Sequence, residues 1–261
     1  MFPTLFEIGP FPVRSYGLLI AISFAIGIWW GKVRAEKRGM DGIVFTDLVV
    51  AILIASVLGA RLAYVIPFWD EYGSHPLRIF KLWEGGLTLY GGIFGAIVGS
   101  LLFCSYKKIS FWLAADICAP LVALGIGITR VGCYLNGCCF GVPTSFWTGT
   151  IFPATCAAGR EYPGIPIHPS QLYDAAFGFA LTGILLAVEP KLRGRGQLWL
   201  VFIMLYGANR YLQDLLRYFD PETTVRLAGH AFSGTQLVSL AMVAVGLALF
   251  FLRGRSVAKS H

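Results

Sequence analysis

Seven long apolar segments alternate with short polar or basic segments along the chain. Each is close to the roughly 20 residues that a helix needs to cross a bilayer core about 30 Å thick. The apolar segments predict transmembrane helices at 15–31, 43–67, 87–105, 111–135, 170–188, 197–217 and 235–252. We therefore expect an all-α membrane protein of about seven transmembrane helices, with residues 1–261 forming a single integral membrane domain. The longest polar connection, residues 135–169, is expected to be a loop segment between the fourth and fifth helices.

The composition supports a membrane protein and argues against a soluble domain. Hydrophobic residues make up 56% of the chain and charged residues only 13%, whereas a soluble domain carries about 25% charged residues. The first apolar segment does not have the features of a removable signal peptide. It has no basic n-region beyond Arg14, and no small-residue cleavage site follows it. We expect it to remain as the first helix.

The formal net charge of +7 would suit a nucleic-acid partner, but the positions of the basic residues indicate membrane topology instead. Twelve of the 21 Lys and Arg residues follow the first, third, fifth and seventh helices, and six lie in the opposite segments. Because basic residues accumulate on the cytoplasmic side, we expect the N-terminus outside and the C-terminus inside. In this topology residues 135–169 are extracytoplasmic, and no nucleic-acid partner is expected.

Three basic residues interrupt the apolar helices: Arg61, Arg130 and Arg210. A charge in the hydrocarbon core costs a few kcal/mol, so such residues are usually paired or face a water-filled cavity. Each arginine lies five to seven residues before the expected outer end of its helix, which is roughly 7–11 Å below that end. Tyr16 and Tyr90 fall at the outer ends of their own helices. These five residues predict one polar site near the outer leaflet.

The sixth predicted helix has a polar face, on which four residues recur at spacings of four, four and three: Tyr206, Arg210, Asp214 and Arg217. One interpretation is an ion pair between Arg210 and Asp214 that only neutralises the helix. Arg61 alone has a simple alternative as well, since an arginine near a helix end can extend to the interface. We favour a functional interpretation of Arg130 and Arg210 together, because two guanidinium groups suit a phosphate group.

Glycines and a histidine lie near the same expected depth. Gly91 and Gly92 follow Tyr90, and they allow either close helix packing or access of a ligand to backbone N–H groups. His168 precedes the fifth helix, and Ser170 is a candidate N-cap of that helix. Both a structural and a catalytic role for His168 remain open.

Four of the six cysteines lie at or beyond the outer end of the fourth helix: Cys133, Cys138, Cys139 and Cys156. In an oxidising compartment a disulfide between Cys156 and either Cys138 or Cys139 is plausible. Cys138 or Cys139 is also a candidate nucleophile, because Arg130 would lower a nearby thiol pKa. The spacing C-x4-C-C lacks the two separated CxxC pairs of a zinc ribbon, so neither a metal site nor a cofactor is expected.

Taken together, the motifs resemble those of the bacterial prolipoprotein diacylglyceryl transferase family. They occur in the same order and cover nearly the whole chain. The motifs are Gly9-Pro10 with Tyr16-Gly17, Leu58 to Tyr64 (LGARLAY), Trp83 to Gly86 leading into Gly91-Gly92, Arg130 to Gly141, His168 to Tyr173 (HPSQLY), Tyr206 to Arg210 (YGANR), and Gly234 to Gln236.

The resemblance implies an all-helical, multi-pass enzyme of the bacterial cytoplasmic membrane. Such an enzyme moves the diacylglyceryl group of phosphatidylglycerol onto the lipobox cysteine of a preprolipoprotein signal peptide, forming a thioether and releasing glycerol phosphate. By this resemblance Arg130 and Arg210 hold the phosphate and stabilise charge on the leaving group. With Tyr90 and Cys138 they are the candidate catalytic residues. The candidate substrate-binding residues are Tyr16, Arg61, Tyr64, Gly91, Gly92, Asn136, Gly137, Gly141, His168, Tyr206 and Asp214.

The chain departs from the family pattern at the positions expected to handle protons. Tyr90 replaces a histidine, and with an ordinary pKa near 10 a tyrosine is a poor base at neutral pH. Cys133 replaces an asparagine, and Cys138 replaces a glutamate. Asp214 also replaces a glutamate, but an aspartate there can still orient Arg210. Two alternatives therefore stay open. One is a non-catalytic phospholipid-binding or transport protein, and the other is an outer-face membrane thiol redox protein.

Overall fold

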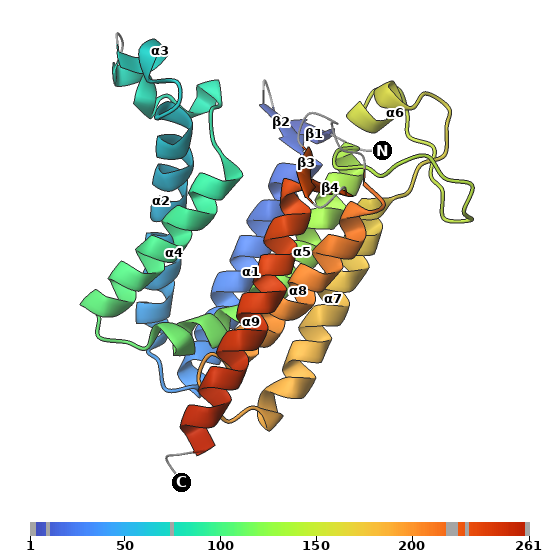
Figure 1. Cartoon of the computed structure of the whole chain (residues 1–261). Helices are drawn as coiled ribbons and strands as arrows, with labels where there is room; N and C mark the ends of the chain where they lie inside the picture. The colour runs from blue at the N-terminus through green and yellow to red at the C-terminus, as the bar shows by residue number, and fades with distance from the viewer. Residues whose placement is uncertain (1–3, 9–10, 74–75, 218–223, 228–229, 259–261) are drawn as a thin grey trace. The chain divides into compact units, whose positions relative to one another are not determined.

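The computed structural model describes residues 4–8, 11–73, 76–217, 224–227 and 230–258, and a long helix is found at each of the seven predicted positions (Figure 1). The long helices are α1 (Ser15–Lys37), α2 (Gly42–Val65), α4 (Leu89–Tyr106), α5 (Phe111–Asn136), α7 (Ser170–Val188), α8 (Gln197–Asp214) and α9 (Gly234–Ala258). The shorter helical elements are α3 (Trp69–Gly73), α6 (Ala157–Glu161), η1 (Pro76–Phe80), η2 (Leu82–Glu84) and η3 (Glu189–Lys191).

Among the described residues, six helices are long and apolar enough to cross a membrane: α1, α2, α4, α5, α7 and α9. The protein is therefore a multi-pass membrane protein with a helical fold, as the sequence predicted. The remaining long helix, α8, is less apolar because it carries Arg210, Asp214 and several amides within 18 residues. It also ends at Asp214 rather than at the predicted residue 217. Seven membrane crossings stay a prediction.

Two short antiparallel hairpins were not predicted. β1 (Thr4–Ile8) pairs with β2 (Phe11–Arg14) directly before α1, and β3 (Thr224–Leu227) pairs with β4 (His230–Ser233) directly before α9. Each strand has only four or five residues, which is too short for hydrophobic alternation to distinguish it from a loop.

The chain divides into two compact units, one of which spans residues 28–114. In this unit α2 and α4 pack closely through small residues. A Cβ atom added to Gly95 would lie 2.2 Å from the carbonyl oxygen of Ala55, and one added to Gly91 would lie 2.4 Å from Cβ of Ala63. Of the two interpretations of Gly91, the structure supports helix packing. The amide of Gly92 donates to the Thr88 carbonyl within the first turn of α4, and the substrate-binding roles of both glycines stay predictions.

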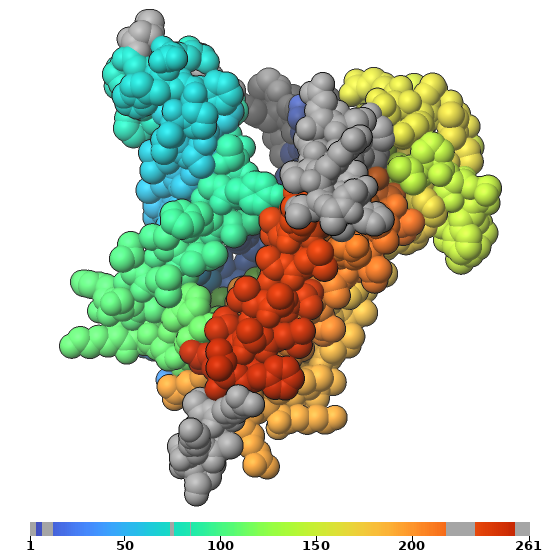
Figure 2. Space-filling view, in the orientation of Figure 1, coloured from blue at the N-terminus to red at the C-terminus, as the bar shows by residue number. Residues whose placement is uncertain are grey.

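The other unit comprises residues 1–27 and 115–261, and in it α5, α7, α8 and α9 lie side by side (Figure 1). Its buried core lies between α5, α7 and α8 and consists of Ala119, Ala123, Leu181, Leu185, Leu198 and Phe202. Helix α9 lies at the front of this unit in Figure 2, and its exposed residues include Val238, Val245 and Phe251. Exposed apolar residues on a spanning helix are expected to face lipid.

A buried carboxylate fixes the start of α8 against α5. Asp116 accepts hydrogen bonds from the amides of Gly196 at 2.6 Å and Trp199 at 2.9 Å. It thereby caps the N-terminus of α8, where unpaired N–H groups favour a negative charge. In this unit the C-terminal ends of α5 and α8 lie beside the N-terminal ends of α7 and α9 (Figure 1), and the candidate site is at this end.

Candidate functional site

Arg130 is held by a carboxylate from a neighbouring helix. Its Nε lies 3.2 Å from Oδ2 of Asp174 in α7, and the two side chains are 19% and 6% exposed. The other oxygen of Asp174 accepts a hydrogen bond from Nδ2 of Asn209 in α8 at 3.2 Å. Asp174 thus connects three helices, although sequence reasoning missed it. The signal was available, because Asp174 is a charge inside an apolar helix.

Arg210 is paired within its own helix, as one interpretation of the sequence predicted. Its Nη2 lies 2.9 Å from Oδ1 of Asp214. Asp214 also accepts hydrogen bonds from the hydroxyl groups of Ser233, at 3.3 Å, and Thr235. Ser233 and Gln236 form a capping box at the start of α9, since each side chain accepts a hydrogen bond from the backbone amide of the other. The end of α8 and the start of α9 therefore fix the orientation of Arg210.

The site has more guanidinium groups than carboxylates. Burial, followed by the positive charges of Arg210 and Arg130, lowers the pKa of Arg217, so Arg217 lies within electrostatic range of both other arginines. Within the part of the chain that the structure describes, Arg210 Nη1 and Arg217 Nε are buried without a hydrogen-bond acceptor. Buried N–H donors without acceptors are costly. Three arginines beside the carboxylates of Asp174 and Asp214 form an arrangement suited to a phosphate anion.

The end of α5 is a Schellman motif. Gly137 has a φ of +68°, its amide donates to the Tyr134 carbonyl at 3.1 Å, and the Cys138 amide donates to the Cys133 carbonyl at 3.2 Å. In this motif the side chains of the residues that flank the turn, here Cys133 and Cys138, contact each other. A Cβ atom added to Gly137 would also lie 2.4 Å from Sγ of Cys156, so this position requires glycine for two reasons.

Three thiols gather at this turn. The sulfur atoms of Cys133, Cys138 and Cys139 all lie within 4.8 Å of one another. Cys139 has a φ of +59°. Two residues of α7 hold the turn from the other side, since Gln171 Nε2 donates to the Cys138 carbonyl at 2.7 Å and Ser170 Oγ donates to the Cys139 carbonyl at 3.0 Å. Ser170 was predicted as the N-cap of its helix and is instead the first helical residue.

The thiols differ in their electrostatic surroundings. Hydrogen bonds from the thiols of Cys133 and Cys138, and then the positive charges of Arg217 and Arg130, lower the pKa of the Cys139 thiol. Cys139 is also the exposed member of the three, whereas Cys133 is buried. Cys139 is therefore better placed than Cys138 to be a thiolate, although the sequence had singled out Cys138 as the candidate catalytic residue.

The disulfide that the sequence made plausible is not formed in this structure, in which all six cysteines are free thiols. Cys156 is buried, and its thiol donates to the Pro153 carbonyl at 3.2 Å. It packs with Phe152, Ala158 and Ile167. The Cys156 side chain packs directly against Gly137, so Cys156 has a packing role in this structure.

Gly141 and His168 build the scaffold beside the thiols. The Gly141 amide donates to the His168 carbonyl at 3.1 Å, and the Val142 amide donates to the Leu216 carbonyl at 3.0 Å. A Cβ atom on Gly141 would lie 2.6 Å from the Leu216 carbonyl oxygen. The imidazole of His168 contacts the hydroxyl group of Tyr173 at 3.2 Å. This pairing brings the segment after α8, which includes Arg217, next to the turn after α5.

Three further predicted residues lie on the elements that form this end of the unit. Tyr16 is in the first turn of α1, and its Cα would lie 3.3 Å from a Cβ atom added to Gly132 of α5. Tyr206 stacks on Phe202 and interacts electrostatically with Arg130. Asn136 is the last residue of α5.

Arg61 stabilises the backbone of the other unit, residues 28–114. Its guanidinium donates hydrogen bonds to five backbone carbonyls, and its side chain lies over the ring of Tyr72. The acceptors are the carbonyl oxygens of Ile79, Gly85, Gly86, Arg78 and Lys81. All five of its N–H donors are therefore occupied. These hydrogen bonds give Arg61 a structural role, and its substrate-binding role stays a prediction.

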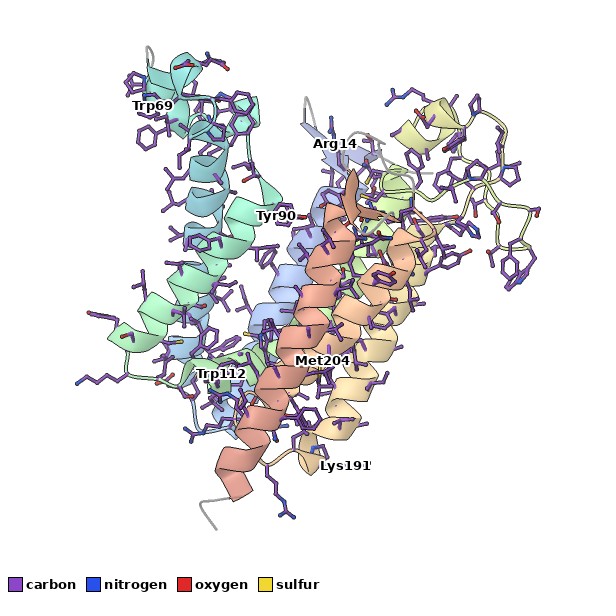
Figure 3. All side chains as sticks on the ribbon, in the orientation of Figure 1. Arg14, Trp69, Tyr90, Trp112, Lys191 and Met204 are labelled. Atoms are coloured by element: carbon purple, nitrogen blue, oxygen red, sulfur yellow. The ribbon has the colours of Figure 1, made fainter. Side chains whose placement is uncertain are left out.

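The other candidates of this unit are Tyr64 and Tyr90. The ring centroids of Tyr64 and Phe68 lie 4.9 Å apart, and the Tyr64 ring packs against Gly86. Tyr90 lies in the first turn of α4 and is 57% exposed (Figure 3). Its catalytic role stays a prediction.

Comparison with known proteins gives consistent matches over nearly the whole chain. Residues 3–252 match the family model described as prolipoprotein diacylglyceryl transferase. A phosphatidylglycerol–prolipoprotein diacylglyceryl transferase of Geobacter sulfurreducens is 35% identical over 259 residues, which cover 97% of this chain and 95% of that protein. Transferases of the same name from Bordetella avium and Bacillus velezensis are 36% and 32% identical, over 97% and 96% of this chain and 95% and 92% of their own lengths. The chain therefore belongs to the prolipoprotein diacylglyceryl transferase family.

Proposed function

We propose that this protein transfers the diacylglyceryl group of phosphatidylglycerol to the thiol of a cysteine in a preprolipoprotein signal peptide. The observation that carries this proposal is the arginine cluster formed by Arg130, Arg210 and Arg217. Asp174 and Asp214 fix two of these guanidinium groups, and buried N–H donors remain for an anion. The relatives named after this reaction support the same substrates.

The reaction requires the stabilisation of a leaving group. The acceptor sulfur, as a thiolate, forms a bond to the terminal glyceryl carbon as the bond between that carbon and its phosphate oxygen breaks. The electron pair of the broken bond stays on the phosphate, which leaves as glycerol phosphate with one more negative charge. Guanidinium groups placed in advance at the phosphate stabilise this developing charge, and such groups are worth more in a low-dielectric site than in water.

We further propose a location and an orientation. The chain would lie in the bacterial cytoplasmic membrane as one integral membrane domain, with its N-terminus outside, its C-terminus inside and residues 135–169 extracytoplasmic. The distribution of basic residues supports this orientation. The arginine cluster would then lie at the depth of the outer leaflet headgroups, where both the lipid and a signal peptide have access to it.

The proposal is tested with the full chain purified in detergent, a lipobox peptide and phosphatidylglycerol labelled in its acyl chains. We expect the peptide to gain the mass of the diacylglyceryl group. Arg130→Ala and Arg210→Ala should lower the rate by a hundredfold or more, on the scale of roughly 10²–10³ for one oxyanion-stabilising donor. Arg160→Ala, at an exposed position in α6, is the matched control and should retain the rate.

The two alternatives correspond to distinct outcomes. Phospholipid that copurifies and depends on Arg130, with no mass gain on any thiol peptide, would indicate a non-catalytic binding protein. Function that depends on the cysteines and not on Arg130 would indicate a thiol redox protein.

A further inference from the structure

Cys133, Cys138 and Cys139 form a cluster whose role the phosphate-binding arginines do not explain. Their three sulfur atoms lie within 4.8 Å of one another, and all three are free thiols. They come from a single turn, although the sequence spacing C-x4-C-C had argued against a metal site.

The backbone builds this cluster by specific means. The Schellman motif at Gly137 brings the flanking side chains of Cys133 and Cys138 together. Cys139 has a left-handed backbone conformation, with a φ of +59°. This conformation costs a residue other than glycine about 1–2 kcal/mol. Hydrogen bonds from Ser170 and Gln171 to the carbonyls of the turn hold that conformation. Strained backbone held in this way is characteristic of functional sites.

The positions of the sulfur atoms suit a zinc ion. A Zn–S distance of about 2.3 Å in tetrahedral geometry places two sulfur ligands roughly 3.8 Å apart. Sulfur atoms within 4.8 Å of one another need to approach by about 1 Å at most to reach that separation. Three protein ligands with the fourth position open is the pattern of a catalytic zinc site, whereas structural sites are closed by four. Cys139 is exposed, so the open position is accessible from outside the fold.

We propose that Cys133, Cys138 and Cys139 bind one Zn²⁺ ion, which takes the acceptor cysteine of the signal peptide as its fourth ligand. This inference rests on the proposed function, and it explains how the acceptor thiol becomes a thiolate. The acceptor thiol releases its proton to water as its sulfur binds the ion, and the resulting thiolate forms the bond to the glyceryl carbon. The carbon–oxygen bond to the phosphate breaks, and glycerol phosphate leaves with the electron pair. No redox change is involved.

The placement of the arginines fits this assignment. Arg130 and Cys133 are three residues apart on α5 and so share a face, and Arg130 interacts electrostatically with Cys133 and Cys139. A phosphate on Arg130 therefore lies beside the thiols, which brings the electrophilic carbon near an acceptor held there. Zn²⁺ with three thiolates has a net charge of −1, and the arginines compensate it. A metal-bound thiol is deprotonated outright, so the site needs no base at Tyr90.

The first measurement is metal content. The full chain, purified in detergent under reducing conditions, should contain about one zinc per chain by elemental mass spectrometry. Cys139→Ser and Cys138→Ser should each lower zinc affinity by more than the roughly 10–100-fold that loss of an outer-shell partner costs, and Ser170→Ala should fall within that range. Cys104→Ser, in α4, is the matched control and should retain the zinc. Size-exclusion profiles show whether each variant is folded.

The second measurement detects the acceptor as a ligand independently of transfer. Zinc is replaced by Co²⁺, whose sulfur-to-metal charge-transfer bands report each thiolate ligand. A lipobox peptide should shift and intensify these bands, and the same peptide with its cysteine changed to serine should not. This shift is expected even in Arg130→Ala, which separates a failure of transfer from a failure of metal binding.

Three results would overturn the inference. The first is a wild-type chain that, purified under reducing conditions, binds no zinc or binds copper instead. The second is a Co²⁺ spectrum that the peptide thiol does not change. The third is an unchanged transfer rate after complete removal of zinc by a chelator, in which case the proposed function would stand without the metal.

Discussion

The guanidinium of Arg130 and the carboxylate of Asp174 form an ion pair, with Nε 3.2 Å from Oδ2, that joins α5 to α7 at the candidate site. Asn209 of α8 donates to the second oxygen of Asp174. A group that we propose binds phosphate is thus also a point where three helices meet, and we expect stability and transfer to be separable there by mutation.

Asp174→Leu should destabilise the protein by roughly 3 kcal/mol, because it leaves the mostly buried charge of Arg130 without its partner. The double variant Asp174→Leu with Arg130→Met should recover much of that stability, since apolar groups often replace a buried ion pair without loss. It should still lack transfer. Thermal unfolding in detergent and the peptide assay measure the two effects. A single Asp174→Leu variant as stable as the wild type would contradict this account of the pair.

Thr235→Val should weaken the hold on Arg210, because the Thr235 hydroxyl donates to Asp214. A hydrogen bond to a charged group contributes about 1.5–3 kcal/mol, so we expect a lower melting temperature together with a higher KM for phosphatidylglycerol. Thr235→Ser keeps the hydroxyl group and is the matched control. Equal KM values for the two variants would show that Asp214 orients Arg210 without help from α9.

Gly137→Ala should be more destabilising than Gly164→Ala. Both glycines have left-handed backbone, with φ of +68° and +72°, so both variants carry the same penalty of about 1–2 kcal/mol. Only at Gly137 would the new Cβ atom meet another residue, 2.4 Å from the Cys156 sulfur, whereas Gly164 has open space. Chemical unfolding compares the pair. Equal losses of stability would mean that the turn after α5 relaxes easily, and the thiols would then not be held together.

Arg61→Lys should loosen the segment that includes η1 and η2. A lysine has three donors on one atom and does not reach the five carbonyls that the guanidinium binds. Trypsin should therefore cleave faster after Arg78 and Lys81, as peptide mass spectrometry would show. Arg160→Lys is the control for general protease sensitivity. An unchanged cleavage rate with a raised KM for phosphatidylglycerol would support the substrate-binding role of Arg61 instead.

The sequence by itself determined the membrane fold, because hydrophobicity over 20 residues and charge at the connections are local properties of the chain. The same logic identified Arg130 and Arg210, since a charge in an apolar helix is costly wherever its partner lies. It also identified the pairing of Arg210 with Asp214, which one helical turn fixes.

Only the tertiary structure decided which partners these charges have. Arg130 pairs with Asp174 of another helix. Arg61 donates hydrogen bonds to backbone carbonyls of the segment 78–86. Neither contact follows from a periodicity in the sequence. The three thiols converge because a glycine with positive φ reverses the chain after α5 and because α7 holds the turn in place. Side chains from different elements meet through packing and backbone geometry, and these depend on the whole fold rather than on spacing along the chain.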